Sequence, residues 1–287
     1  MFRKKKNTLK KDGNTFEIFK TTLIGGTQEG VLGVIQQRIK QGEKIFITTP
    51  NPEFLIFAQT HPWFHKILIH SDIAIPDGIA LFWAKEVLKK KGFFSRLLVG
   101  FWTGLKIIFT GWGEKRVTGT DLMEKLCQLA AKNNWSVYFL GGKEKQRAPI
   151  ALGKMQRKYP GLKGWVNPGP ILSLNFQKLV LEPTLEAKKM VEDINKKKPD
   201  LLFVALNMGK QEKFIYDNWY QLKVKLGMGV GGAFDYLSGE VERAPLWIQK
   251  TGFEWLYRLL KEPWRWRRQR SLLTFIWLIL RDKNDKI

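Results

Sequence analysis

Short apolar runs alternate with helical patterns along this chain, and that alternation limits its fold more than any other feature. The runs at 44–49, 135–142 and 200–206 are rich in β-branched and aromatic residues, which favour strands. Between them the apolar residues follow helical spacing. Strands that alternate with helices predict an α/β fold with a mostly parallel sheet and helices on both faces.

One of the expected helices covers residues 121–134, with Thr120 or Asp121 as its expected N-cap. Cys127, the only cysteine, falls in this apolar helical pattern. We therefore expect a thiol packed in the core rather than a nucleophile. A single cysteine also excludes a disulfide framework and favours a reducing, cytosolic setting.

The charge of the chain points to an anionic partner. The formal net charge is +23 and the sequence pI is about 10.0. Nucleic acid, phospholipid headgroups and a phosphorylated substrate all satisfy this charge, which does not choose among them. The basic N-terminus has no apolar stretch after it, so export is not indicated.

Two apolar segments suggest contact with a membrane surface. One covers 93–112 and is interrupted by Arg96 and Lys106, and the other covers 272–280. Neither forms an uninterrupted run of the roughly 18 to 20 apolar residues that spanning needs. We therefore expect both segments to be interfacial.

The residues that follow the expected strands are the natural place for a ligand, because ligands bind beyond the carboxyl ends of parallel strands. Asp77 follows one strand in a Pro-Asp-Gly turn, where it is either a general base or a turn residue. Gln211 and Glu212 open a helix after another strand. There the backbone amides and the Gln211 side-chain amide could meet phosphate or sugar hydroxyls. The alternative is a helix start with an acidic residue that the helix dipole favours. Gly141 and Gly142 could let the backbone approach a diphosphate.

Metal-dependent and serine-hydrolase chemistry are not indicated. His61 and His65 are four residues apart, but no cysteine is near them and their surroundings are largely apolar. The chain has no Gly-x-Ser-x-Gly elbow. It also has no Asp-x-Asp pair, which argues against a divalent metal holding a nucleotide diphosphate. We predict no metal site.

Arginines alternate with tryptophans just before the apolar run at 272–280. Arg265 and Arg268 are three residues apart, so on a helix they share a face and could clamp one diphosphate. Arg267 and Arg270 form a second such pair. The alternative is a solvated basic face. The attached apolar block and the tryptophans favour a membrane surface instead.

The motifs occur in an order that resembles the WecG/TagA/CpsF glycosyltransferase family, from about residue 45 to about residue 270. The ordered set is T-P-N-P-E, P-D-G-I, R-V-T-G-T-D-L, V-Y-F-L-G-G, P-D-L-L-F-V-A-L, K-Q-E-K, G-V-G-G-A-F-D-Y-L-S-G, R-A-P and E-W-L-Y-R-L-L-K-E-P. Each piece is weak alone, but the ordered set is specific.

The resemblance implies an inverting glycosyltransferase without an essential metal or cofactor. Members transfer N-acetylmannosamine or a related sugar from a UDP donor to undecaprenyl-diphosphate-linked N-acetylglucosamine. They act at the inner face of the cell membrane, as peripheral proteins, in cell-surface polysaccharide or teichoic acid synthesis. A Rossmann-like body carries a C-terminal appendage that closes over the active site.

The resemblance also implies roles for individual residues. Asp77 matches the general base, Thr49 and Asn51 match the pair that lines the same pocket, and Gln211 matches the polar residue of the K-Q-E motif. The expected substrate-binding residues are Arg258, Arg265, Arg268, Gly141, Gly142, Gly231, Gly232 and Asp235.

Two departures from the family stand out. Gly209 occupies the loop where the family often has proline, and the apolar segment at about 89–115 is longer than is typical. We interpret this insertion as a second membrane contact. The expected division is a basic arm at 1–20, the glycosyltransferase domain at 21–243 and the appendage at 244–287.

The expected partners are a UDP-sugar, a polyprenyl-diphosphate-linked acceptor and an anionic membrane surface, with no nucleic acid. Homo-oligomerisation is left open. The competing hypothesis is a non-enzymatic basic protein that binds nucleic acid through interleaved Trp and Arg, or a peripheral membrane protein with a degenerate site.

Overall fold

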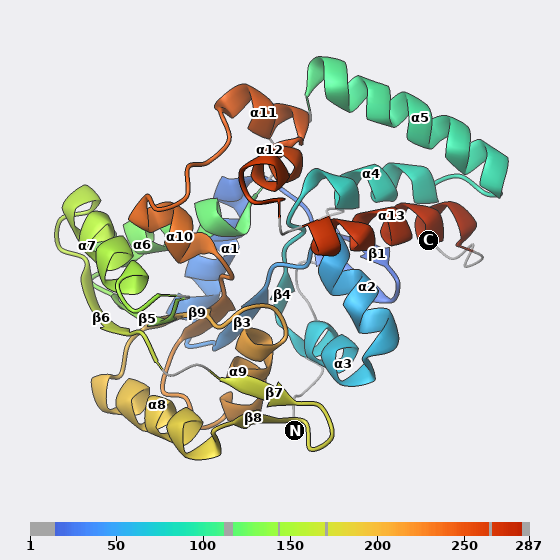
Figure 1. The fold of residues 1–287 in the computed structure, drawn as a ribbon. Coiled ribbons are helices and arrows are strands. Elements are labelled where there is room, and N and C mark those ends of the chain that lie inside the picture. The colour runs from blue at the N-terminus through green and yellow to red at the C-terminus, as the bar shows by residue number, and fades with distance from the viewer. Residues whose placement is uncertain (1–14, 112–116, 143, 170–171, 264–265, 283–287) are drawn as a thin grey trace.

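A six-stranded parallel sheet forms the centre of the molecule (Figure 1). The computed structural model describes residues 15–111, 117–142, 144–169, 172–263 and 266–282. The strands lie in the order β4 (Ile73–Ala74), β3 (Ile45–Thr48), β10 (Leu226–Gly229), β9 (Leu201–Ala205), β5 (Ser136–Gly141) and β6 (Lys163–Asn167). These strands pair with their neighbours in parallel, so the predicted α/β fold is confirmed.

Helices cover both faces of this sheet. On one face a core of buried side chains joins the strands to α1 (Gln28–Lys40), α6 (Gly119–Lys132), α7 (Arg147–Lys158) and α10 (Ala233–Ser238). On the other face a second core involves α8 (Thr184–Lys197) and α9 (Lys210–Asn218). All five residues of β9 are buried, as expected for a strand covered on both sides.

The start of α6 differs from the prediction. Its N-cap is Thr118, whose hydroxyl accepts a hydrogen bond from the Asp121 amide at 3.2 Å. Neither Thr120 nor Asp121 is the cap, because Gly119 already has helical geometry and the helix begins two residues earlier than the apolar pattern does. Cys127 is fully buried in the core on this helix, as predicted.

A third core lies beyond the β4 edge of the sheet. It unites the antiparallel hairpin β1 (Thr15–Ile18) and β2 (Thr21–Ile24) with α2 (Pro52–Thr60), α3 (Pro62–His70), α4 (Ile79–Leu88) and α13 (Trp266–Arg281). From α13 the side chains of Phe275 and Ile279 enter this core and have no exposed surface. The run at 272–280 therefore has a core role that was not expected, since residues four apart on a helix share one face and here that face is packed. Its expected interfacial contact stays a prediction.

The remaining elements lie at the periphery. The helices α11 (Leu246–Thr251) and α12 (Glu254–Lys261) precede α13, and the hairpin β7 (Ser173–Asn175) and β8 (Val180–Glu182) lies next to α8. The apolar segment after residue 92 forms one helix, α5 (Phe93–Thr110). Within the described ranges, α5 is long and apolar enough to cross a membrane by length and composition. Length and composition do not decide between crossing and interfacial contact, so the interfacial contact expected for this segment stays a prediction.

Candidate active site

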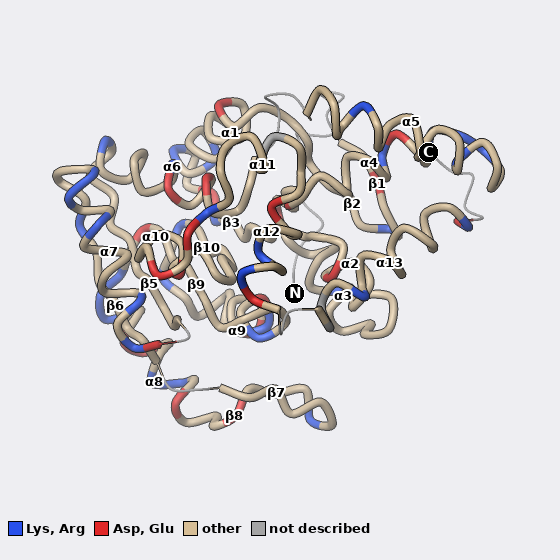
Figure 2. Tube along the Cα trace, turned by 45° about the horizontal axis from the view of Figure 1, so that its top comes forward, with Lys and Arg blue, Asp and Glu red and all other residues tan. Residues whose placement is uncertain are grey.

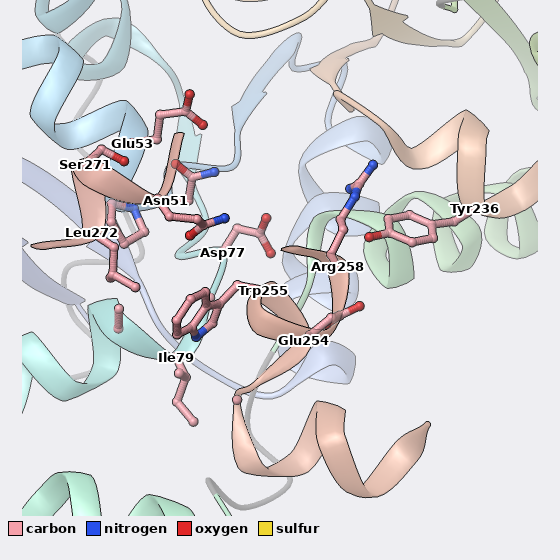
Figure 3. Close-up of a pocket in the computed structure, with 15 residues that line it drawn as sticks. Asn51, Glu53, Asp77, Ile79, Tyr236, Glu254, Trp255, Arg258, Ser271 and Leu272 are labelled. Atoms are coloured by element: carbon pink, nitrogen blue, oxygen red, sulfur yellow. The ribbon is translucent and has the colours of Figure 1, made fainter. Parts of the chain in front are cut away.

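A pocket of about 260 Å³ opens between the carboxyl ends of β3 and β4 and the C-terminal helices (Figure 3). The loops after the two strands form one wall. The helices α12 and α13 and the turn before α12 form the other. The lining residues are Asn51, Pro52, Glu53, Asp77, Gly78, Ile79, Ala80, Tyr236, Gly252, Glu254, Trp255, Arg258, Gln269, Ser271 and Leu272.

The wall formed by the loops after β3 and β4, here called the strand-exit wall, is held together by backbone and capping hydrogen bonds. Asn51 caps α2, with its side-chain oxygen accepting from the Phe54 amide at 3.0 Å. The Asp77 amide donates to the Pro50 carbonyl at 2.7 Å, which joins the two exits directly. In Figure 3 the Asp77 side chain lies between those of Asn51 and Arg258. The structure therefore brings the predicted base into the pocket.

Arg258 supplies a positive charge from the opposite wall. Its Nε donates to Glu262 at 2.7 Å, and its guanidinium carbon lies 4.8 Å from the centre of the Tyr236 ring. Burial lowers the pKa of Arg258, but Tyr236, Glu262 and Asp235 raise it, and the net direction is upward. The guanidinium therefore stays charged and faces the same cavity as Asp77.

Asp235 and Gly232 lie next to this arginine, as expected for one binding region. An Asp235 oxygen lies 4.0 Å from Arg258, and the other accepts a hydrogen bond from Arg147 at 2.5 Å. A Cβ added to Gly232 would come within 3.4 Å of the Arg258 guanidinium. Asp235 thus bridges α7 and α12 behind the pocket.

Gly141 and Gly142 lie at the end of β5, and packing explains the first of them. Gly141 has φ +89°, and a Cβ there would lie 2.7 Å from the Ala205 carbonyl oxygen. Gly142 donates its amide to the same oxygen at 3.0 Å. Close approach of β5 to β9 therefore requires glycine at 141.

Gln211 is buried behind the pocket rather than in its lining. Its side-chain amide donates to Glu212 at 2.6 Å, and its oxygen accepts from the Gly231 amide at 2.9 Å. Glu212 in turn accepts from the Gly209 amide at 2.7 Å. The pair therefore fixes the turn at Gly231, which leads into the residues beside Arg258.

Glu212 has no exposed surface, which makes it unusual for a carboxylate. Burial raises its pKa to about 7, although hydrogen bonds from Gln211 and Gly209 lower it. The sequence identified Glu212 only as an acid at a helix start. Its burial depends on the packing of α9 against β10, which residue type alone does not reveal.

Other predicted residues lie elsewhere or outside the described part of the chain. Thr49 is buried and packs against Gly119, where its methyl lies 3.4 Å from the position of an added Cβ. Arg265 lies outside the described residues, and so does the side chain of Arg268. The sequence reasoning did not single out Tyr236, Glu254, Trp255 or Ser271, although the first three lie inside or beside motifs that it used.

The C-terminal wall is anchored to the body by a pair of motif residues. Arg243, in the R-A-P motif, forms an ion pair with Asp121 on α6 and lies 3.6 Å from Glu254 on α12. Further along, Gly252 has φ +79°, and a Cβ there would lie 2.5 Å from Ile79. Glycine thus lets the turn before α12 close onto α4.

Histidine ligation of a metal has no support in the described residues. No group of three His, Cys, Asp or Glu side chains among them is placed to hold an ion. His61 stacks on Phe57 with 3.8 Å between ring centres, and its Nδ1 lies 3.0 Å from the Phe57 carbonyl oxygen.

Comparison with known proteins identifies the family. The chain matches the model of the "Glycosyl transferase WecG/TagA/CpsF family" over residues 16–96 and 100–286. It is similar to a protein of Bacillus subtilis (strain 168), with 29% identity over 240 residues, which cover 84% of this chain and 80% of that protein. That relative is named N-acetylglucosaminyldiphosphoundecaprenol N-acetyl-beta-D-mannosaminyltransferase.

Two further relatives carry the same name. The protein of Bacillus spizizenii is 26% identical over 252 residues, which cover 86% of this chain and 82% of that protein. The protein of Staphylococcus aureus (strain MRSA252) is 28% identical over 240 residues, with 84% and 81% covered. The family match covers most of the chain, including the strand exits and the C-terminal helices that form the pocket. The chain therefore belongs to the WecG/TagA/CpsF family and is a glycosyltransferase.

Proposed function

We propose that the protein transfers N-acetylmannosamine from a UDP donor to N-acetylglucosamine linked through a diphosphate to undecaprenol. The names of its relatives support this acceptor and this sugar. The product would serve the synthesis of teichoic acid or another cell-surface polysaccharide.

The meeting of Asp77 and Arg258 in one pocket carries the proposal. Transfer requires a base that accepts the proton of the acceptor hydroxyl and a positive charge that stabilises the departing diphosphate. These two groups come from opposite walls, and the cavity between them has room for a reacting sugar. If Asp77 were only a solvated turn residue, its side chain would not need to line such a cavity.

In the proposed reaction the acceptor hydroxyl oxygen attacks the anomeric carbon from the face opposite UDP. Asp77 takes the hydroxyl proton as the new carbon–oxygen bond forms. The bond between the anomeric carbon and the UDP oxygen breaks, and UDP leaves with the electron pair, so the configuration inverts. Arg258 and backbone amides offset the charge on UDP without a metal, since a guanidinium pairs well with phosphate oxygens.

The remaining predicted residues have supporting roles in this proposal. Asn51 contacts the sugar from the strand-exit wall, while Gln211 holds the Gly231 turn and Thr49 packs behind the wall. The arginines 265 and 268 would contact the acceptor diphosphate. The domain at 21–243 would bind the donor, and the segment 244–287 would close the site at the inner membrane face, with the arm at 1–20 as an additional basic contact.

Replacing Asp77 tests the proposed chemistry. We expect Asp77→Asn to lower turnover by about 10²- to 10⁴-fold, the usual contribution of a general base, while UDP binding stays close to that of the wild type. The matched control is Asp217→Asn, which removes a partly exposed carboxylate paired with Lys213 on α9. Turnover should be followed by product mass with a panel of UDP-sugars and a polyprenyl-diphosphate-N-acetylglucosamine analogue. Full turnover by Asp77→Asn would remove the base assignment.

A further inference from the structure

We propose that α5 docks on the surface of a lipid bilayer and lies in the plane of the membrane without crossing it. This inference rests on the proposed function in one respect, namely that the acceptor is held in a membrane. The helix belongs to the segment at 89–115, which is separate from the C-terminal helices that line the pocket.

One face of α5 presents large apolar side chains to solvent. Phe94 and Phe109, near the two ends of the helix, are 83% and 81% exposed. Other exposed apolar residues lie between them along one face of α5, because positions three, four and seven apart share a face. We call this face the apolar stripe. The exposed members are Phe93, Phe94, Leu97, Leu98, Phe101, Trp102, Ile108 and Phe109.

The opposite face of α5 is seated on the body, which fixes the direction of the apolar stripe. Its buried residues are Arg96, Gly100 and Ile107. The Trp83 indole on α4 donates to the Gly100 carbonyl at 2.9 Å, and a Cβ on Gly100 would approach that ring to 2.9 Å. Glycine thus allows close contact between the two helices. The stripe points outward because of this packing.

The chain length around α5 excludes a membrane-spanning arrangement. Eighteen residues of helix are about 27 Å long, close to the thickness of the hydrocarbon core. A spanning helix would place its two ends on opposite sides of the bilayer. Only six peptide steps separate Gly111 from Val117, which is buried in the main core, and they reach at most about 22 Å. The helix must therefore lie flat.

Charge favours an anionic lipid surface as the occupant of this stripe. Lys90 and Lys91 lie just before the helix, after Lys89, which pairs with Glu86 on α4, and Lys106 is exposed on the flank of α5. The sequence from 89 to 113 contains no Asp or Glu. Basic residues beside exposed aromatic ones are typical of segments that rest among anionic headgroups. In Figure 2 many other Lys and Arg residues lie on α7 and β6, on the side of the molecule away from α5.

The apolar surface continues onto helices that reach the pocket. The helix α11 contacts α5 and exposes 73% of Leu246 and 68% of Trp247. The helix α13 also contacts α5 and exposes 71% of Leu273 and 52% of Trp277. Ser271 and Leu272, at the start of the same apolar segment of α13, line the pocket. A bilayer on this surface would bring a lipid-linked diphosphate beside the site.

Vesicle binding tests the docking surface. The variant combines Phe94→Ser, Trp102→Ser and Phe109→Ser in the full chain, and we measure its partition onto vesicles of phosphatidylglycerol and phosphatidylcholine. Losing three interfacial aromatic side chains should weaken the partition by about ten-fold or more. The control combines Phe176→Ser, Leu185→Ser and Tyr220→Ser, which are 57%, 62% and 63% exposed at other sites. Unchanged binding by the α5 variant, or an equal loss in the control, would overturn the proposal.

A spin label distinguishes lying from spanning. Cys127, the only cysteine, is fully buried, so a cysteine introduced at 94, 101 or 109 carries the label selectively. On vesicles the three labels should show similar, shallow depths by their accessibility to oxygen and to a water-soluble nickel complex. A label at 101 deep in the hydrocarbon, with those at 94 and 109 at opposite surfaces, would overturn the in-plane orientation.

Activity measurements separate this proposal from the proposed function. The α5 variant should keep the kcat/KM of the wild type with a water-soluble, short-chain acceptor and lose activity with the undecaprenyl acceptor in vesicles. If the wild type transfers no sugar to either acceptor, the proposed function fails, and the vesicle partition still decides the role of α5. If the wild type dimerises in solution and the variant is monomeric with unchanged vesicle binding, α5 is a contact between copies and the membrane proposal fails.

Discussion

The helices α5 and α13 both carry many apolar side chains but bury them to very different extents. Both are rich in aliphatic and aromatic residues, and they contact one another. In α13 the side chains of Phe275 and Ile279 fill a core, whereas α5 buries only Arg96, Gly100 and Ile107. An apolar composition therefore does not distinguish a core helix from a docking helix. The residues on the inward face do.

The inward faces explain this difference. Phe275 and Ile279 are large and four residues apart, so they fill the space between α2, α4 and α13. The corresponding face of α5 has Gly100, which lets the backbone approach Trp83 of α4, and Arg96, whose buried side chain donates to the Lys90 carbonyl. The large apolar side chains of α5 lie outside this contact. Removing α13 would open the third core. Truncation after Pro263 would for this reason perturb folding as well as any membrane contact.

The largest effect should come from the core side of this comparison. We expect Phe275→Ala to lower the free energy of unfolding by about 3–5 kcal/mol, because it leaves a cavity in a packed core. Phe101→Ala on α5 removes the same atoms from a side chain that is 60% exposed. It should change the free energy of unfolding by less than about 0.5 kcal/mol. Denaturant unfolding monitored by circular dichroism measures both. Equal losses would show that α5 is also a core helix.

Glu212 provides a pH-dependent reference away from both helices. Burial raises its folded pKa from 4.5 to about 7, so between these values the folded state binds more protons than the unfolded state. The free energy of unfolding should therefore fall by about 3 kcal/mol as the pH rises from 4.5 to above 7. Glu212→Gln should abolish this contribution. The triple α5 variant should retain this pH dependence. Loss of the pH dependence in that variant would show that α5 and the central sheet are not independent.

The smallest effect should come from the contact that joins the two helices. Arg96 is buried, donates through Nε to the Lys90 carbonyl at 2.8 Å and also donates to the Asp282 carbonyl just after α13. Arg96→Met should cost about 1.5–3 kcal/mol, as expected for hydrogen bonds from a charged donor. Amide exchange should become faster at the end of α13. Lys106→Met, on the exposed side of α5, is the control. An equal loss in the free energy of unfolding in this variant would show that the Arg96 hydrogen bonds do not join the two helices.

The sheet and most helices could be predicted because their patterns are local. Strand runs such as that at 200–206 have turn residues beside them, and β9 lies within that run as Leu201–Ala205. The motif order also identified Asp77, Asn51 and Arg258, which the structure brings to one pocket. Asp77 and Asn51 meet because the carboxyl ends of parallel strands share one edge, whereas Arg258 reaches the pocket from α12 in the opposite wall.

What could not be predicted depends on packing between distant segments. The core role of Phe275 requires knowledge of where α2 and α4 lie, and the burial of Glu212 requires the fit of α9 against β10. Arg96 looked like an interruption of an apolar run, but it is folded inward onto two backbone carbonyls. In each case the residue type suggests one environment and a long-range contact creates another.

The hydrogen bond from the Asp77 amide to the Pro50 carbonyl ties the loop after β4 to the loop after β3. The proposed base and Asn51 therefore belong to one wall of the pocket that is linked through its backbone. The opposite wall is also attached to the body, through the ion pair between Arg243 and Asp121 and through α13, whose Phe275 and Ile279 lie in the third core. The positions of the proposed base and of Arg258 are thus set by folding, and substrate would enter a site that is already assembled.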